Sequence, residues 1–322
     1  MSPYSLARGL CALFALAACS TPPSPSVDAA TPDAAVDVVD VVDAPPPEDA
    51  APWRCPRARP AVPATVPRCN GSAALCDRRF DQVAYATTHN AMASEERAFA
   101  SPNQRFSITR QLRDGVRGLM LDVHPWRDEA WLCHGTCLAG AQRHVEGLCE
   151  VAQFLDANPT DVVTLIYESY VPGAAVVADL RAVGLDEDAF TQGAGDAWPT
   201  LGELVRGRRR LVVLTDRDDD AAPWYMNVWR YAQENPYAAA TPAGLTCAQN
   251  RGRSTNALFI LNHFLTAPLA SPELAAMVNG AAALTDHARR CEQERMRMAN
   301  FVTVDFYDIG DALAVVTALN AR

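Results

Sequence analysis

Lysine is absent from this 322-residue sequence, so all 28 of its basic residues are arginine. The chain also has no apolar run of the roughly 20 residues that a membrane-spanning helix needs, and we therefore expect no transmembrane helix. No glycine-rich loop follows the first strand-like segment. This absence argues against a nucleotide-binding fold that cradles phosphates in such a loop.

Residues 1–18 have the composition of a signal peptide. Arg8 is the only charged side chain before a short apolar run over 9–18, and small residues precede Cys19. The segment Leu16-Ala17-Ala18-Cys19 resembles the lipobox of bacterial lipoproteins, in which the cysteine is acylated and becomes the first residue of the mature chain. We therefore expect an exported lipoprotein that is anchored to a membrane through Cys19. The alternative is a plain secretory signal with a chance cysteine.

Residues 19–52 have a composition that does not support a core. After Cys19 they contain only Pro, Ala, Val, Asp, Glu, Ser and Thr, and their seven acidic side chains carry most of the formal net charge of −10. We expect this segment to be a disordered, extended tether. Its acidic charge argues against nucleic acid as a partner. Residues 53–322 are long enough for one large domain, which we expect to be monomeric.

Ten cysteines are present, and eight remain if Cys11 is removed with the signal and Cys19 is acylated. An even number in an exported protein predicts four disulfides. We expect Cys247 to pair with Cys291, because these two are isolated from the rest; the pairing of the other six stays open. The alternative around Cys133-His134-Gly135-Thr136-Cys137 is a zinc site, but no second cysteine pair has zinc-ribbon spacing.

Six short apolar runs rich in β-branched residues predict strands, over 83–87, 116–123, 162–167, 211–215, 258–262 and 302–306. Helical patterns lie between most of them, over 145–157, 174–183, 201–205, 272–278, 286–298 and 310–319. Repeated strand–helix alternation predicts a parallel sheet. We therefore expect an α/β fold, a distorted or incomplete TIM (β/α) barrel, with a doubly wound open sheet as the alternative.

Every predicted strand delivers an ionisable or amide side chain at its C-terminal end. The residues are His89 and Asn90, Asp122 and His124, Glu168, Asp216, Asn262 and His263, and Asp305. In a barrel these ends form the rim where active sites are built, so we expect the side chains to converge there.

Other polar and aromatic residues lack this placement. We expect His144 and His287 at the surface and the arginine-rich segment 206–210 in a solvated loop. The aromatic group Trp224, Tyr225, Trp229 and Tyr231 is an interfacial patch, a substrate wall or packing within a loop.

Two histidines and several carboxylates on one rim suit phosphodiester cleavage. One histidine accepts a proton from the attacking oxygen, and a second protonates the departing oxygen. A metal ion or an arginine must stabilise the charge on the phosphoryl oxygens.

Three segments resemble motifs of the phosphatidylinositol-specific phospholipase C X-domain family. They are Ala86-Thr87-Thr88-His89-Asn90-Ala91-Met92-Ala93, Gly115-Val116-Arg117-Gly118-Leu119-Met120-Leu121-Asp122-Val123-His124 and Leu132-Cys133-His134-Gly135. The similarity continues through 161–168, 198–201 and 300–307, in order, over most of the domain. The resemblance implies a distorted TIM barrel that cleaves a phosphodiester, usually in a phosphoinositide.

The resemblance also implies roles for single residues. His89 would be the general base, His134 the general acid, and Asp122 would lie beside the phosphate and its cation. Asn90, Asp122 and Glu168 stand where the calcium-dependent branch binds Ca²⁺, and oxygen ligands of this kind suit that ion.

His124 departs from the family pattern, because other branches have an arginine or another acid there. It is either a further phosphate contact or a structural hydrogen-bond donor. Arg117 is the rival to a metal, but it lies early in its strand, near the opposite end. Asp305 and His263 are candidate substrate-binding residues. The competing functions are a phosphodiesterase for soluble glycerophosphodiesters and a barrel that binds a surface without catalysis.

Overall fold

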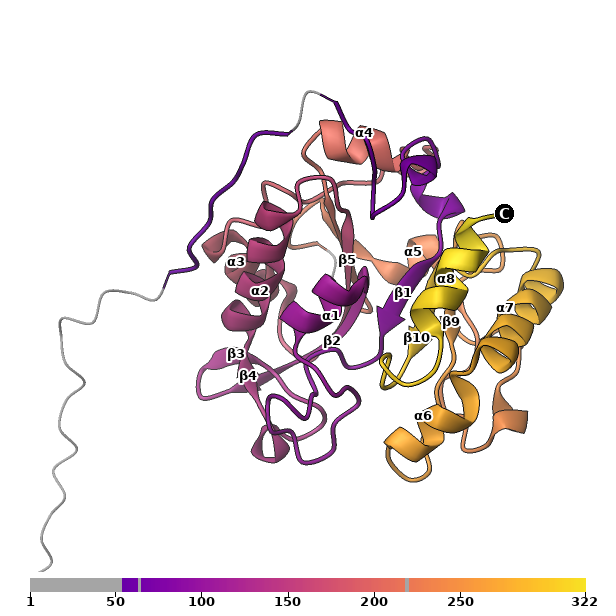
Figure 1. The fold of residues 1–322 in the computed structure, drawn as a ribbon. Helices are drawn as coiled ribbons and strands as arrows, with labels where there is room; N and C mark the ends of the chain where they lie inside the picture. The colour runs from indigo at the N-terminus through magenta and orange to yellow at the C-terminus, as the bar shows by residue number, and fades with distance from the viewer. Residues whose placement is uncertain (1–53, 63–64, 218–219) are drawn as a thin grey trace, which may run out of the picture. The chain divides into compact units, whose positions relative to one another are not determined.

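The computed structural model describes residues 54–62, 65–217 and 220–322. Helices surround a curled sheet in which eight parallel strands follow the order β7-β6-β5-β2-β1-β10-β9-β8 (Figure 1). Their bounds are β1 Tyr85–Thr88, β2 Gly118–Trp126, β5 Val163–Ser169, β6 Leu211–Thr215, β7 Tyr225–Asn227, β8 Ala232–Glu234, β9 Leu258–Asn262 and β10 Phe301–Val304. Within these ranges no backbone pairing joins β7 to β8, so the barrel is open along that seam.

The curl of the sheet follows from the alternation of side chains along each strand. Tyr85, Ile166, Leu214, Ile260 and Phe301 come from five different strands and share one buried cluster inside the sheet. Alternate residues pack outward against the helices in a second cluster. An incomplete TIM barrel is therefore confirmed, and the doubly wound alternative is wrong, because an open sheet would not enclose a common interior.

One glycine in the barrel wall is required by close packing. Gly118 of β2 lies in register with Thr87 of β1, and both side-chain positions face the barrel interior. A Cβ atom at Gly118 would lie 2.3 Å from the Oγ1 atom of Thr87. The glycine lets these two neighbouring strands approach at this level of the barrel.

The helices are α1 Ile108–Asp114, α2 His144–Ala157, α3 Gly173–Ala182, α4 Leu201–Arg206, α5 Val228–Tyr231, α6 Pro272–Val278, α7 Ala281–Arg295 and α8 Ala312–Asn320. All six predicted helices are present, although α7 begins five residues before the predicted start. The short helices α1 and α5 and the three-residue strands β7 and β8 were not predicted, since such short elements have little periodicity. None of the helices described is long and apolar enough to cross a membrane.

A small antiparallel extension projects from β2. Strand β3 Glu129–Leu132 pairs with β2, and β4 Gln142–Arg143 pairs with β3. The two strands lie beyond the C-terminal end of the barrel strands (Figure 1). Residues 133–141, which connect them, carry His134. This extension was not predicted.

Four disulfides join the eight cysteines of residues 54–322: Cys55–Cys149, Cys69–Cys76, Cys133–Cys137 and Cys247–Cys291. The predicted number and the Cys247–Cys291 pair are confirmed. The zinc alternative is wrong, because Cys133 and Cys137 bond to each other and have no free thiolates. Cys247 and Cys291 lie close to His287, but their two sulfur atoms are also bonded to each other and provide no free thiolate for a metal.

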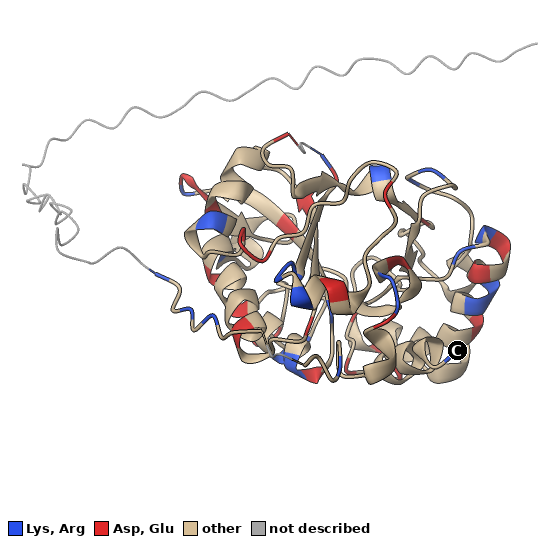
Figure 2. Ribbon diagram, turned by 90° about the horizontal axis from the view of Figure 1, so that it is seen from above, with Lys and Arg blue, Asp and Glu red and all other residues tan. Residues whose placement is uncertain are grey.

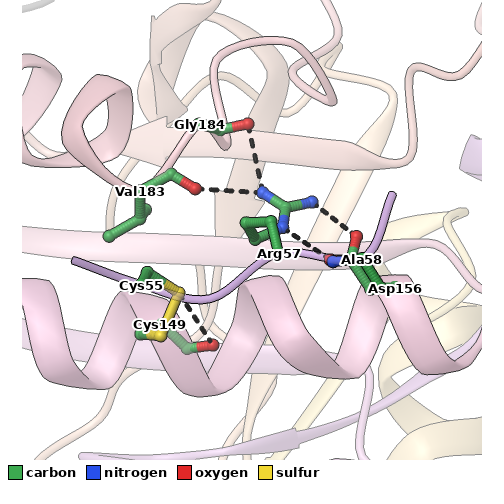
Figure 3. The surroundings of a disulfide bond; sticks show 7 residues. All are labelled: Cys55, Arg57, Ala58, Cys149, Asp156, Val183 and Gly184. Atoms are coloured by element: carbon green, nitrogen blue, oxygen red, sulfur yellow. Dashed lines mark hydrogen bonds and ion pairs between the residues drawn. A yellow bond between two sulfur atoms is a disulfide. The ribbon is translucent and has the colours of Figure 1, made fainter. Parts of the chain in front are cut away.

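The first described residues form a strap along the outside of the barrel (Figure 3). Cys55 is bonded to Cys149 of α2, and the Arg57 guanidinium donates to both carboxylate oxygens of Asp156 at 2.8 and 2.9 Å. Arg57 also donates to Asp188 and to the carbonyl oxygens of Val183 and Gly184. The strap is therefore fixed by a covalent bond and a largely buried ion-pair network.

Three polar residues are buried where we expected exposure. His144 is fully buried, with Nδ1 2.8 Å from Asp179 and Nε2 2.9 Å from the Tyr167 hydroxyl. His287 is buried against His263, and Arg210 is buried with its guanidinium on Asp188. Residues 206–209 are exposed as predicted. The predictions for the three buried residues are wrong because distant segments supply their polar partners.

The aromatic group near β7 is not an exposed patch. Tyr225 is buried, and Trp224, Trp229 and Tyr231 are partly buried. Trp229 lines the pocket described below, whereas Tyr231 packs against Trp198. Charged residues of both signs are spread around the outer helices and loops (Figure 2).

Candidate active site

A pocket opens at the C-terminal ends of the barrel strands. Its polar lining consists of His89, Asn90, Asp122, Glu168, Asp216, Glu234 and Arg251, and Trp229 forms part of its wall. Most of these residues follow or end a strand, as expected for a barrel rim. The structure thus brings together the first histidine, Asn90 and both predicted metal-ligand carboxylates.

His89 is held by a carboxylate behind it. Its Nδ1 atom lies 3.0 Å from Asp305 Oδ1, which also accepts from Asn103 at 3.0 Å. Because a carboxylate only accepts, Nδ1 carries the proton and Nε2 is left as the basic atom. Burial is the largest single effect and would lower the pKa of His89, but the carboxylates of Asp305, Asp122 and Glu168 together outweigh it, and the pKa is raised. The ring also stacks on Phe264 at 4.0 Å between centroids.

Asp122 and Glu168 stand side by side on neighbouring strands, as register partners of β2 and β5. Burial, followed by the charges of Glu168 and Asp216, raises the pKa of Asp122 to about 7. A buried carboxylate whose pKa is raised by neighbouring negative charge favours a bound cation.

Asn90 connects the carboxylate pair to the second histidine. Its backbone has a positive φ of 45°, and its amide lies 3.2 and 3.3 Å from the two carboxylate oxygens of Asp122. With the amide nitrogen turned toward Asp122, the amide oxygen accepts from His134 Nε2 at 3.2 Å. Turned the other way, the amide places its oxygen beside the carboxylate, as a shared cation would require. Burial, followed by the charge of His89, lowers the pKa of His134.

His124 does not line the pocket. Its ring stacks on Tyr170 at 4.2 Å between centroids, and the Tyr170 hydroxyl donates to Glu168 Oε1. Burial lowers the pKa of His124. His124 therefore contacts Tyr170, and Tyr170 in turn contacts Glu168 of the carboxylate pair. This places His124 behind the pocket wall, where it supports Tyr170.

His263 is not brought to the site, which corrects our placement of it among substrate-binding residues. It follows Asn262 by one residue, so it faces the helices instead of the barrel interior. Its two ring nitrogens contact His287 and the carbonyl oxygen of Val278, and it is 1% exposed. Asp305 is at the site, where its carboxylate contacts His89 and Asn103.

Arg117 lies at the other end of the barrel, as expected. Its guanidinium pairs with Asp161 at 2.7 Å and donates to the carbonyl oxygens of Leu112 and Val116. It is therefore bound by local partners and far along β2 from Asp122.

Several residues of the site were missed. Gln104 donates to the carbonyl oxygen of His89, and Asn103 supports Asp305. Arg251 pairs with the buried Glu234, and its guanidinium lies 4.3 Å from the ring centroid of Trp229. All come from loops or very short strands without a periodic pattern, so only the polar Asn103-Gln104 pair near a motif offered a local signal.

The sequence profile of the PI-PLC X 1 family matches residues 75–320. The chain belongs to the PI-PLC X domain family. A PI-PLC X domain-containing protein of Arabidopsis thaliana is 32% identical over 267 residues, covering 75% of this chain and 62% of that protein. An uncharacterized secreted protein of Arthroderma benhamiae is 28% identical, covering 82% of this chain and 65% of its own length. The chain thus spans slightly less than two thirds of these two relatives.

Solved structures share the fold of this PI-PLC X domain. The phosphatidylinositol-specific phospholipase C of Listeria monocytogenes superposes with a TM-score of 0.53 at 15% identity, covering 77% of this chain and 95% of that one. A Staphylococcus aureus phosphatidylinositol-specific phospholipase C gives a TM-score of 0.52 at 12% identity, with 77% and 95% coverage. At these identities the likeness establishes the TIM-barrel-like fold.

Proposed function

We propose that this protein is an exported phosphoric diester hydrolase of the phospholipase C type, which cleaves a phospholipid or phosphoinositide at the phosphodiester. The observation that carries the proposal is the chain of contacts on one rim, in which Asp305 holds His89, and Asn90 links Asp122 to His134. The family and the fold support the same reaction class.

In the proposed reaction the two histidines divide the proton transfers. The Nε2 atom of His89 takes the proton of the attacking hydroxyl, while Asp305 fixes the ring and stabilises the imidazolium that forms. His134 then protonates the departing oxygen.

A divalent cation, most simply Ca²⁺, fits the oxygen donors of Asn90, Asp122 and Glu168. The raised pKa of Asp122 supports this assignment. Binding the ion through Asn90 would require its amide to turn, so that the oxygen and not the nitrogen lies beside the Asp122 carboxylate. When bound, the ion would supply charge stabilisation at the phosphoryl oxygens.

The acid–base assignment requires a neutral His89 and a protonated His134 before reaction, which is opposite to their pKa shifts in the free protein. The charges of Asp122 and Glu168 help to raise the pKa of His89, so neutralising them lowers it. A substrate phosphate beside His134 raises the pKa of that residue. We therefore expect ligand binding to move both histidines toward the states that the reaction needs.

The first experiment tests activity. Purified protein should cleave phosphatidylinositol vesicles, and His89→Ala and His134→Ala should each lower kcat/KM by at least about 10²-fold. The double variant should lose far less than the product of the two, because the residues act as a unit. Near-normal activity in either single variant contradicts the assignment. Faster cleavage of glycerophosphodiesters than of the lipid would favour the soluble-substrate alternative. No cleavage of either substrate would favour a barrel that binds a surface without catalysis.

The second experiment tests the metal. Exhaustive chelation should abolish activity, and Ca²⁺ should restore it. Glu168→Gln should weaken Ca²⁺ binding in calorimetry, whereas Glu129→Gln, an exposed carboxylate on β3, should not. Activity that survives chelation, in protein free of metal, would refute the calcium assignment.

Export is supported by the four disulfides and by the similarity to a fungal protein described as secreted. The signal peptide over 1–18, the acylated Cys19 and the tether over 19–52 lie outside the described residues and stay predictions. Cys19→Ser should release the protein from membranes and remove an acyl mass. A native chain without that mass would contradict lipidation.

A further inference from the structure

The loop that carries His134 is closed by a very short disulfide. Cys133 and Cys137 are bonded at a sequence separation of 4, so His134 lies within a small covalent ring. Cys133 is fully buried, whereas Cys137 is partly exposed. The other three disulfides have separations of 7, 44 and 94. The shortest of these, Cys69–Cys76, encloses no residue of the candidate active site.

The backbone of this ring has little else to hold it. The Cys133 amide donates to the Asp122 carbonyl oxygen at 3.3 Å, and the Ala100 amide donates to Ala139 at 2.7 Å. Between these two points, the backbone hydrogen bonds seen in the described residues are local, such as Thr136 to His134 at 3.0 Å. Residues 135 and 136 are exposed.

The loop that connects β3 to β4 and carries His134 is long. Leu132 is the last paired residue of β3, and Gln142 is the first of β4. Without the disulfide, nine residues would connect these points, held to neighbouring segments by the Cys133–Asp122 bond at one end and the Ala100–Ala139 bond near the other. A side chain on such a loop can shift easily, and a displacement of about 1 Å can cost about 10²-fold in rate.

The imidazole itself depends on that backbone. His134 Nε2 lies 3.2 Å from the Asn90 amide, and its ring also bonds to the backbone of Ser101. These contacts orient the ring only while the main chain holds it in reach. The covalent ring is the feature that fixes the main chain on both sides of His134.

We propose that Cys133 and Cys137 are positioning residues for the proton-donating step, and that their disulfide makes the activity sensitive to dithiol reductants. This inference rests on the proposed function, with His134 as general acid. Neither cysteine touches the substrate.

Reduction of the Cys133–Cys137 disulfide by a dithiol is an ordinary thiol–disulfide exchange. A thiolate of the dithiol attacks the Sγ of Cys137, the more exposed sulfur, and Cys133 leaves as a thiolate that takes up a proton. The second thiol of the reagent then displaces Cys137. The enzyme gains two electrons and two protons, and the reagent leaves as a disulfide.

The decisive experiment compares two leaving groups. Phosphatidylinositol releases an alkoxide that needs a proton, whereas an inositol phosphodiester of nitrophenol releases a phenolate that does not. In Cys133→Ser/Cys137→Ser, kcat on phosphatidylinositol should fall about 10²-fold with little change in KM. Activity on the nitrophenyl ester should stay within about two-fold of native, since the general acid contributes little there. The matched control, Cys69→Ser/Cys76→Ser, should behave as native on both substrates.

A second measurement avoids the substitution. Native protein is titrated with dithiothreitol, and mass spectrometry identifies which pair is reduced. Loss of phosphatidylinositol cleavage should follow reduction of Cys133–Cys137 and recover on reoxidation. In the reduced protein, His134→Ala should cost little more on that substrate.

Equal losses on both substrates, or no loss on either, would overturn this inference while leaving the proposed function intact. A native, oxidised protein that cleaves neither substrate would overturn the proposed function and this inference with it.

Discussion

Acidification should destabilise the domain through the buried pair His263 and His287. The two side chains are 1% and 2% exposed, and their Nδ1 atoms lie 2.8 Å apart. His263 Nε2 lies 2.9 Å from the Val278 carbonyl oxygen, which only accepts, so His263 donates there. Its Nδ1 must then accept from His287 Nδ1–H. Both rings are neutral. A further proton on His263 would place an Nδ1–H group of His263 opposite the Nδ1–H group of His287, with no acceptor between them.

The magnitude follows from the pKa values. Burial is the main reason that the pKa of His263 falls to about 4 and that of His287 to about 3, and the charge of Arg290 lowers both. In the unfolded chain both should titrate at about 6.5. Since the folded values are lower, the unfolded chain binds more protons, and stability is complete above about pH 6.5 and lost as the pH falls. At pH 5 each histidine should cost about 2 kcal/mol, and the pair about 4 kcal/mol.

The assay is guanidinium unfolding at pH 7.5 and 5, followed by tryptophan fluorescence. Between pH 7.5 and pH 5 the free energy of unfolding should fall in both proteins. The fall should be about 2 kcal/mol smaller in His287→Met than in the native protein, because one titrating group is gone. Asp286→Asn changes an exposed neighbour on α7 and should keep the native pH dependence. Equal pH dependence in native protein and His287→Met would refute the reasoning.

Two further substitutions test the packing of the barrel. Arg57→Met should lower the free energy of unfolding by about 3 kcal/mol in urea, because Asp156 and Asp188 lose a largely buried guanidinium. An unchanged urea midpoint would show that the strap contributes nothing. Gly118→Ala should cost about 1–3 kcal/mol, since the new methyl group meets Thr87. Adding Thr87→Ala should recover part of that loss, and a purely additive double variant would count against steric conflict.

The strands and helices with a clear period could be read from the sequence. Runs of β-branched residues located all six of the longer barrel strands, within a few residues of their observed bounds. Strands β7 and β8 have three residues each, and β8 ends in Gln233 and Glu234, so no apolar run marks them. The seam of the barrel was therefore invisible, along with Glu234 and Arg251, which line the pocket beside it.

Partner identity is the part that sequence reasoning could not supply. His144 finds Asp179 and Tyr167, and Arg210 finds Asp188, across separations of 22 to 35 residues. Nothing local distinguishes such residues from solvated ones. A helix pattern gives the position of a polar side chain, but only the packed fold shows whether a hydrogen-bond or ion-pair partner lies next to it.

The geometry of the site follows from one rule, the alternation of side chains along parallel strands. In β1 and β10 the interior positions are Tyr85 and Phe301, then Thr87 and Thr303, which are register partners. The next interior positions are His89 and Asp305, which explains why they meet. In β2 and β5 the interior pairs rise from Met120 and Ile166 to Asp122 and Glu168.

Register also relates the two halves of the site. Thr87 pairs with Gly118, so His89 stands level with Met120, and Asp122 lies one interior step higher. The acid–base residue therefore rests on apolar neighbours, and the carboxylate pair lies above it toward solvent. His263 stands one residue out of this alternation, at the end of a strand but on the wrong face. The strand end alone was an incomplete criterion, and strand end combined with parity would have separated His89 and Asp305 from His263.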